Sequence, residues 1–433
     1  MEELGYSAVL LVVFFALLGS GIWIAFCLLG VAFVGMSLFT PVPVGQVMAT
    51  SIWGSSNAWP LAAIPMFIWM GEILSRSRVS EDLFNGLAPW MRWIPGGLVH
   101  VNILGCGLFA AVSGSSVATA ATIGKMSIPE LLKRGYPPSL VLGSLAGSGT
   151  LGFLIPPSVI LIVYGVAIEE SIVRLFLAGV LPGLLLLVLF TGYVILWSVL
   201  NPRQIPRQVE PILGGDIVRR SIRLLPILLL IFGVLGSIYL GIASPTDAAA
   251  VGVGMALLIG WLSGSLTRTS FIESLFSAIR TSCMITFILA AASFLTVVMG
   301  FTGIPRALAE WIGTMQLSPT LLICVLTVAF IVLGCFLDGI SIVVLTTAVI
   351  LPMIDQAGID RIWFGVYLAI VVEMSQITPP VGFNLFALQG LTGHNILYLT
   401  RAAAPFFFIL LLAIGIIVVF PDIAVWLPKQ TGH

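Results

Sequence analysis

Charged residues are scarce in this sequence. Asp, Glu, Lys and Arg together make up 8% of its 433 residues, whereas soluble globular domains carry about 25%. Hydrophobic residues make up 59% of the chain, and its mean hydropathy is +1.16. The composition therefore excludes a soluble globular protein and predicts an all-α protein that crosses the membrane several times. The 18 basic residues balance 18 acidic ones and form no dense patch, which excludes nucleic acid as a partner.

Cysteine and histidine are also scarce. The five cysteines stand singly in apolar runs, so neither a disulfide framework nor a cysteine-based metal site is expected. The sequence lacks HExxH, paired aspartates in GxGD form and any serine–histidine couple at catalytic spacing, which argues against a membrane-embedded enzyme. The first residues are acidic where a secretory signal would carry Lys or Arg, so we expect the first helix to be retained.

Long apolar segments predict the membrane spans. A span needs about 20 apolar residues, and the candidates are Ser7–Leu18 with Ile22–Phe39, Pro60–Leu74, Leu175–Leu200, Leu224–Leu240, Ala248–Leu266, Thr281–Phe301 and Ala402–Val419. Four further apolar segments are interrupted by small residues and proline, namely Leu98–Leu132, Pro138–Ile168, Thr320–Ile354 and Trp363–Gln389.

Basic residues predict how these spans are oriented. Residues 201–223 form the longest polar segment and carry mainly positive charge, with Arg203, Arg207, Arg219, Arg220 and Arg223 against Glu210 and Asp216. Basic loops of membrane proteins lie in the cytoplasm, so we place this linker there. Counting spans back from it puts the amino terminus outside, in the periplasm. The linker thus joins two halves, residues 1–200 and 224–433, that are expected to have opposite orientations.

Two Pro-Pro steps, Pro156–Pro157 and Pro379–Pro380, interrupt apolar segments, one in each half. A double proline stops a regular helix, and lipid tolerates such a break only where it is buried in protein or lines a polar cavity. The residue numbers of the second step exceed those of the first by 223, and the same offset pairs Pro129 with Pro352, Gly135 with Gly358 and Pro182 with Pro405. Matched breaks in oppositely oriented halves are typical of the inverted repeats of secondary transporters, and they disfavour a passive channel.

The first half contains two candidate binding motifs. Ser113–Thr119 (SGSSVAT) lies midway between two cytoplasmic flanks, which predicts a re-entrant helical hairpin over about residues 98–132 with this motif at its tip. Its hydroxyls and freed carbonyls suit Na⁺, and helix amino-terminal NH groups suit a carboxylate; tight helix packing is the alternative. Gly149–Ser158 (GTLGFLIPPS) lies in a predicted broken helix, about residues 138–168, whose unwinding is expected to expose the carbonyls of Gly149 and Thr150. A proline kink without a ligand is the alternative there.

The second half contains the counterparts of these motifs. Gly334–Ser341 (GCFLDGIS) predicts a second hairpin over about residues 320–354. Its Asp338 lies deep in an apolar segment, so it either faces a cation or caps a helix. Met374–Asn384 (MSQITPPVGFN) predicts a second broken helix over about residues 363–389. Glu373, directly before it, either lines the transport path or pairs with an arginine.

Four segments, SGSSVATAATIG, GTLGFLIPPSVILIVYGVA, PTDAAAVGVGMALL and ITPPVGFNLFALQG, resemble in order and spacing the large membrane subunit of tripartite ATP-independent periplasmic (TRAP) transporters. The resemblance covers essentially the whole chain. It implies an importer of organic acid anions, such as C4-dicarboxylates or sialic acids, in the bacterial inner membrane, driven by a sodium gradient rather than ATP. It also implies two partners, an extracytoplasmic substrate-binding protein and a separate small four-helix membrane subunit. The implied mechanism is an elevator, in which a transport domain of two hairpins and two broken helices slides against a scaffold domain.

The resemblance groups each hairpin tip with one break as a binding site. Na⁺, as the co-transported ion, is then expected at Ser113, Gly114, Ser115, Gly149, Thr150, Gly334, Asp338, Gly339 and Thr378. The substrate is expected at Ser115, Ser116, Thr119, Gly339, Ser375 and Asn384. No motif contains an arginine for an anionic substrate, so helix amino termini or the binding protein are expected to recognise it. The alternative is a stand-alone sodium-coupled dicarboxylate or citrate carrier of related architecture, which needs no binding protein.

Overall fold

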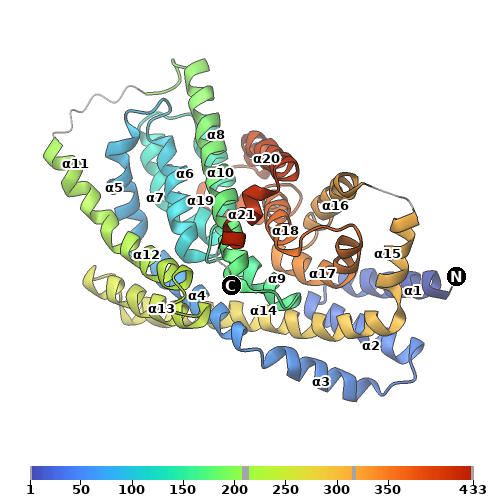
Figure 1. Cartoon of the computed structure of the whole chain (residues 1–433). Helices are drawn as coiled ribbons and strands as arrows, with labels where there is room; N and C mark the ends of the chain where they lie inside the picture. The colour runs from blue at the N-terminus through green and yellow to red at the C-terminus, as the bar shows by residue number, and fades with distance from the viewer. Residues whose placement is uncertain (1, 207–213, 315–317, 431–433) are drawn as a thin grey trace.

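The computed structural model describes residues 2–206, 214–314 and 318–430. Within these ranges every regular element is a helix, which confirms the all-α prediction (Figure 1). In chain order the elements are α1 (Glu2–Gly19), α2 (Ile24–Phe39), α3 (Val44–Ser56), η1 (Trp59–Ala62), α4 (Ala63–Ser75), α5 (Val79–Met91), α6 (Val99–Ser113), α7 (Ser116–Lys133), α8 (Pro138–Gly149), η2 (Thr150–Phe153), α9 (Val159–Ala167), α10 (Ile172–Leu200), α11 (Gly214–Ser221), η3 (Ile222–Leu224), α12 (Leu225–Tyr239), α13 (Pro245–Leu262), α14 (Arg268–Thr302), α15 (Ile304–Thr314), α16 (Pro319–Gly334), α17 (Gly339–Gln356), α18 (Arg361–Gln376), α19 (Phe383–Thr392), α20 (Ile396–Val419) and α21 (Asp422–Gln430).

Several of the described helices are long and apolar enough to cross a membrane. There are five of them, or up to seven if each of two bent helix pairs counts as one span. The five are Ile172–Leu200, Ile217–Tyr239, Pro245–Leu262, Arg268–Thr302 and Ile396–Val419. Each overlaps a span predicted from the sequence. Of the predicted cytoplasmic linker, Arg207 and Glu210 lie outside the described residues.

Short polar side chains begin the helices at both predicted hairpin tips. The Ser115 hydroxyl accepts the Ala118 amide at the start of α7, and Asp338 accepts the Ile340 and Ser341 amides at the start of α17. Such caps satisfy backbone donors that a helix leaves unpaired in its first turn. The positive ends of two helix dipoles therefore lie at these tips.

The helix bounds repeat at the same offset as the prolines. Adding 223 to the bounds of α7 gives 339–356, the bounds of α17, and adding it to those of α2 gives 247–262, within α13. One pair departs from this pattern. The α3 and α4 helices of the first half are bent by 59° at a break, whereas their counterpart α14 is one continuous helix of 35 residues. A reciprocal capping box between Thr267 and Ser270 starts α14 well before the predicted span at Thr281.

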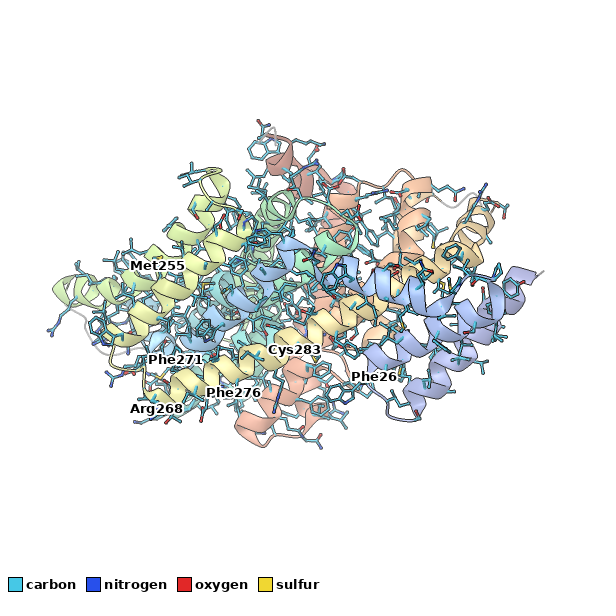
Figure 2. The ribbon with its side chains drawn as sticks, turned by 90° about the horizontal axis from the view of Figure 1, so that it is seen from below. Phe26, Met255, Arg268, Phe271, Phe276 and Cys283 are labelled. Atoms are coloured by element: carbon cyan, nitrogen blue, oxygen red, sulfur yellow. The ribbon has the colours of Figure 1, made fainter. Side chains whose placement is uncertain are left out.

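Helix α14 runs along one side of the molecule, in contact with α2, α3 and α4 (Figure 1). Seen from below, Arg268, Phe271, Phe276 and Cys283 follow one another along it, with Phe26 of α2 nearby (Figure 2). The Phe26 ring packs edge-on against Phe287, with ring centroids 5.0 Å apart. Phe276 is 68% exposed, as expected for a side chain that faces lipid.

The two interrupted helices, α8 with α9 and α18 with α19, lie above α14 in Figure 1. Of these, α8 and α18 are deeply buried. Every residue of α18 from Ile362 to Gln376 is buried, as is every residue of α8 from Leu140 to Gly149. Helix α8 can approach α20 closely because it carries glycines there. A Cβ atom at Gly143 would collide with the Ala402 carbonyl oxygen, and one at Gly147 would collide with the Phe406 ring. Small residues thus set the spacing of these helices.

Candidate functional site

The first motif forms the turn between α6 and α7, which pack against each other as a helical hairpin. Gly114 ends α6 in the left-handed conformation with φ of 59°, where a side chain would be strained. The Thr119 hydroxyl donates to the Ser115 carbonyl at 2.7 Å and lies 2.7 Å from the Ser113 hydroxyl. The tip is therefore a rigid group of oxygen atoms beside a helix amino terminus.

The first interrupted helix passes directly beside this tip. A Cβ atom at Gly152 would lie 2.5 Å from the Ser115 carbonyl carbon and 2.7 Å from the Ser116 nitrogen, so only glycine permits the contact. The α-helix ends within the predicted motif: Gly149 is the last residue of α8, and Thr150 begins the 3-10 turn η2, which ends at Phe153. The Thr150 hydroxyl donates to the Gly147 carbonyl at 2.5 Å. Both Pro-Pro steps have a cis peptide bond.

Glu373 joins the two halves at this point. Its carboxylate accepts the Ser116 hydroxyl at 2.9 Å and the Phe153 amide at 3.1 Å, although it belongs to α18 of the second half. Asn384 of α19 donates its side-chain amide to the same Ser116 hydroxyl at 2.7 Å. All three side chains are buried. The predicted substrate residues Ser116 and Asn384 are thus brought together, with Glu373 between the halves.

Of the two alternatives for Glu373, pairing with an arginine is not found among the described residues. None of the ion pairs between described side chains includes Glu373. The contact of Glu373 with the first hairpin tip was not predicted from the sequence, although the offset of 223 residues could have indicated it. The offset that pairs the two Pro-Pro steps also aligns Glu373 with Thr150, a residue already assigned to the site.

The two motifs of the second half, Gly334–Ser341 and Met374–Asn384, also contact each other, next to the first hairpin tip. Asp338 caps α17, and the Ser341 hydroxyl also donates to its carboxylate, so the capping interpretation holds whether or not a cation also binds. Gly334 lies against Ser375, where a Cβ atom would collide with the Ser375 Cβ. The Thr378 hydroxyl donates to the Ser375 carbonyl at 3.0 Å. Gly339 packs against both Val372 and Phe153, and Phe153 also bonds Glu373, so the two groups are contiguous.

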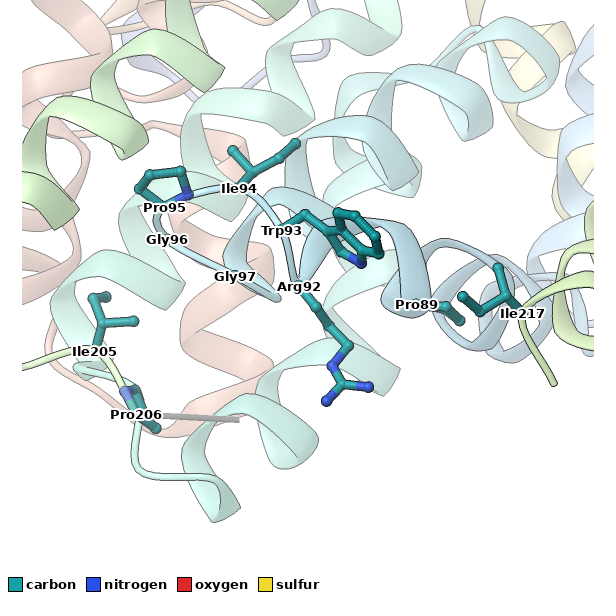
Figure 3. Close-up of a pocket in the computed structure, with 10 residues that line it drawn as sticks. All are labelled: Pro89, Arg92, Trp93, Ile94, Pro95, Gly96, Gly97, Ile205, Pro206 and Ile217. Carbon is teal, nitrogen blue, oxygen red and sulfur yellow. The ribbon is translucent and has the colours of Figure 1, made fainter. Parts of the chain in front are cut away.

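A cavity of about 110 Å³ lies beside the first hairpin tip. It is lined by Ser113, Gly114 and Ser115, by Phe153, and by Glu72 of α4 and Thr281 of α14. This volume exceeds the roughly 30 Å³ that one water occupies in the liquid. A larger cavity of about 660 Å³ lies elsewhere, between the turn after α5 and residues Ile205–Pro206, with Arg92 and Trp93 in its wall (Figure 3). None of the predicted site residues lines this larger cavity.

The chain is similar over most of its length to known membrane proteins. The sequence model of the DctM component of tripartite ATP-independent periplasmic transporters matches residues 11–423. The C4-dicarboxylate TRAP transporter large permease protein DctM of Pseudomonas aeruginosa is 33% identical, over 91% of this chain and 92% of its own length. The ectoine TRAP transporter large permease protein TeaC of Halomonas elongata is 33% identical, over 85% and 86%. The sialic acid TRAP transporter large permease protein SiaM of Vibrio cholerae is 28% identical, over 95% and 96%.

One solved structure supports the same type of fold. The YdaH transporter of Alcanivorax borkumensis superimposes with a TM-score of 0.60 over 88% of each chain, at 13% sequence identity. The likeness is therefore one of backbone architecture.

Proposed function

We propose that this chain imports an organic acid anion together with Na⁺. It belongs to the DctM family, the large permease subunits of TRAP transporters. It is a multi-pass inner-membrane protein, and its relatives are transporter subunits rather than enzymes. The observation that carries the proposal is the contact of the oxygen-rich hairpin tip with an interrupted helix. Hydroxyls and carbonyls there suit Na⁺, and the helix amino terminus suits a carboxylate.

The substrate class rests on the relatives and on the chemistry of the tips. Relatives are named for C4-dicarboxylate, ectoine and sialic acid. Ser115, Ser116, Thr119, Gly339, Ser375 and Asn384 are the proposed substrate residues. The proposed mechanism is an elevator movement of the two inverted repeats, with the hairpins re-entrant from opposite sides of the membrane and the amino terminus in the periplasm.

Two partners are part of the proposal. A small four-helix membrane subunit and an extracytoplasmic binding protein are expected, as family membership implies. Uptake by liposomes should therefore require the cognate binding protein as well as both membrane subunits. Uptake of the free substrate at the full rate without any binding protein would contradict this part of the proposal.

Asp338 offers a test of the second Na⁺ site. Asn caps helices about as well as Asp, so Asp338→Asn keeps the start of α17 and removes the charge. We expect the Na⁺ concentration for half-maximal uptake to rise by about tenfold or more. Asp360→Asn is the matched control, because Asp360 caps α18 in the same way and is exposed. Unchanged sodium dependence in Asp338→Asn would count against Asp338 as a ligand.

A further inference from the structure

The buried carboxylate of Glu373 has no positive charge beside it in the described protein. Glu373 is only 1% exposed. The two groups that donate hydrogen bonds to its carboxylate, the Ser116 hydroxyl and the Phe153 amide, are both neutral. An ionised carboxylate removed from water is strongly unfavourable unless a cation or a dense set of donors compensates it. Two neutral donors are a sparse set for a carboxylate with two oxygens.

Asn384 adds a second group that lacks a partner. The Ser116 hydroxyl has one hydrogen, which it gives to Glu373, so Asn384 must meet that hydroxyl with its NH₂ group. This orientation leaves Asn384 Oδ1 buried and without a hydrogen-bond partner among the described residues. Buried side-chain oxygens nearly always have a partner. An open acceptor and an uncompensated carboxylate that share one partner, the Ser116 hydroxyl, point to a bound cation.

We propose that Glu373, Asn384 and Ser116 hold a Na⁺ ion where the two halves meet, in addition to the two sites that pair a hairpin tip with a break. This inference rests on the proposed sodium-coupled function. Carboxylate, amide and hydroxyl oxygens are hard ligands that suit a hard cation. The site supplies one negative charge, which a monovalent ion neutralises and a divalent ion would overcompensate. The ligands come from α18, α19 and α7, so an ion bound there would join both halves.

The site also has a consequence for the substrate. Ser116 is a proposed substrate residue, and an unneutralised Glu373 beside it would repel an anion. Na⁺ at Glu373 removes this repulsion, so it should strengthen binding of the anionic substrate. By linkage, the substrate must strengthen binding of Na⁺ by the same factor.

The variant Glu373→Gln tests the site, because it keeps the size and shape of the side chain and removes its charge. The Gln oxygen can still accept the Phe153 amide, and its NH₂ group can donate to the Ser116 hydroxyl. The full-length protein is purified, and thermal unfolding is followed as NaCl replaces choline chloride at constant ionic strength. Without Na⁺, E373Q is expected to unfold at a higher temperature than the wild type, because it has no uncompensated charge. At saturating Na⁺ this order is expected to reverse. In uptake, the Na⁺ concentration for half-maximal rate should rise about tenfold or more.

Two further variants make the test specific. Glu310→Gln is the control, because Glu310 is an exposed carboxylate paired with Arg306, and its response to Na⁺ should equal that of the wild type. Asn384→Ala removes the amide ligand and should also raise the Na⁺ concentration needed for half-maximal uptake, while Glu373 stays in place.

The results of these experiments distinguish failure of the Glu373 site from failure of the proposed sodium coupling. If the wild type responds to Na⁺ and E373Q responds identically, the site is refuted and the proposed function stands; a Glu373 that holds a proton would give this result. If the wild type itself shows no response to Na⁺ in unfolding or in uptake, the proposed sodium coupling is refuted.

Discussion

Replacing Gly152 with Ala is expected to abolish most uptake. The added Cβ atom would lie 2.5 Å from the carbonyl carbon and oxygen of Ser115 and 2.7 Å from the Ser116 nitrogen. These are backbone atoms, so no side chain can rotate away, and the hairpin tip must move off the interrupted helix. Overpacking of this kind costs roughly 1–3 kcal/mol of stability. The displaced tip also loses its contacts to the transported solutes, and each 1.4 kcal/mol lost from their binding lowers affinity about tenfold, so we expect uptake to fall by at least about tenfold.

Gly254→Ala is the control for this substitution. Gly254 lies in α13, and no heavy atom lies within 4 Å of the position that a Cβ would take, so an Ala there should be neutral or slightly stabilising. Initial rates of uptake and thermal unfolding of both variants provide the comparison. Wild-type uptake by Gly152→Ala would show that the contact between the tip and the interrupted helix is not needed.

Replacing Ser116 with Ala is expected to have the second large effect. The hydroxyl donates to Glu373 and accepts from Asn384, so its removal leaves two buried polar groups without this partner. Each such orphaned group costs roughly 1–3 kcal/mol. Both the midpoint of thermal unfolding and the rate of uptake should therefore fall, the latter by about tenfold or more.

Ser127→Ala is the matched control on the same helix. The Ser127 hydroxyl is equally buried but has no hydrogen-bond partner among the described residues. Its removal should therefore cost little or even stabilise the protein. Equal effects of the two substitutions would mean that the Ser116 hydroxyl does not link the halves.

The elements around the site could be predicted because their causes are local. A double proline stops a helix wherever it occurs, so the interruptions near Pro156–Pro157 and Pro379–Pro380 follow from the sequence. The small and polar residues within two long apolar segments likewise predicted hairpin tips at Ser113–Thr119 and Gly334–Ser341, and turns lie there, between α6 and α7 and between α16 and α17. The offset between the two Pro-Pro steps extends to helices far from these motifs, such as α2 and α13.

Contacts between the halves could not be predicted, because they depend on packing. Ser116 is 257 residues from Glu373 and 268 from Asn384, and no local pattern records their contact. A proline pair also does not say how the helix before it ends, and a 3-10 turn carries the chain on to Phe153. The continuity of α14 escaped prediction for a related reason. Its polar first turns, after Arg268, fall outside an apolar span, although a capping box begins the helix there.

The proposed sodium coupling is tested most directly by uptake into liposomes that contain this chain and its small membrane subunit, with the cognate binding protein and labelled substrate outside. An inward Na⁺ gradient, imposed without ATP, should drive accumulation of the substrate, and dissipating the gradient should stop it. Accumulation that ignores the Na⁺ gradient and follows ATP would contradict the proposal.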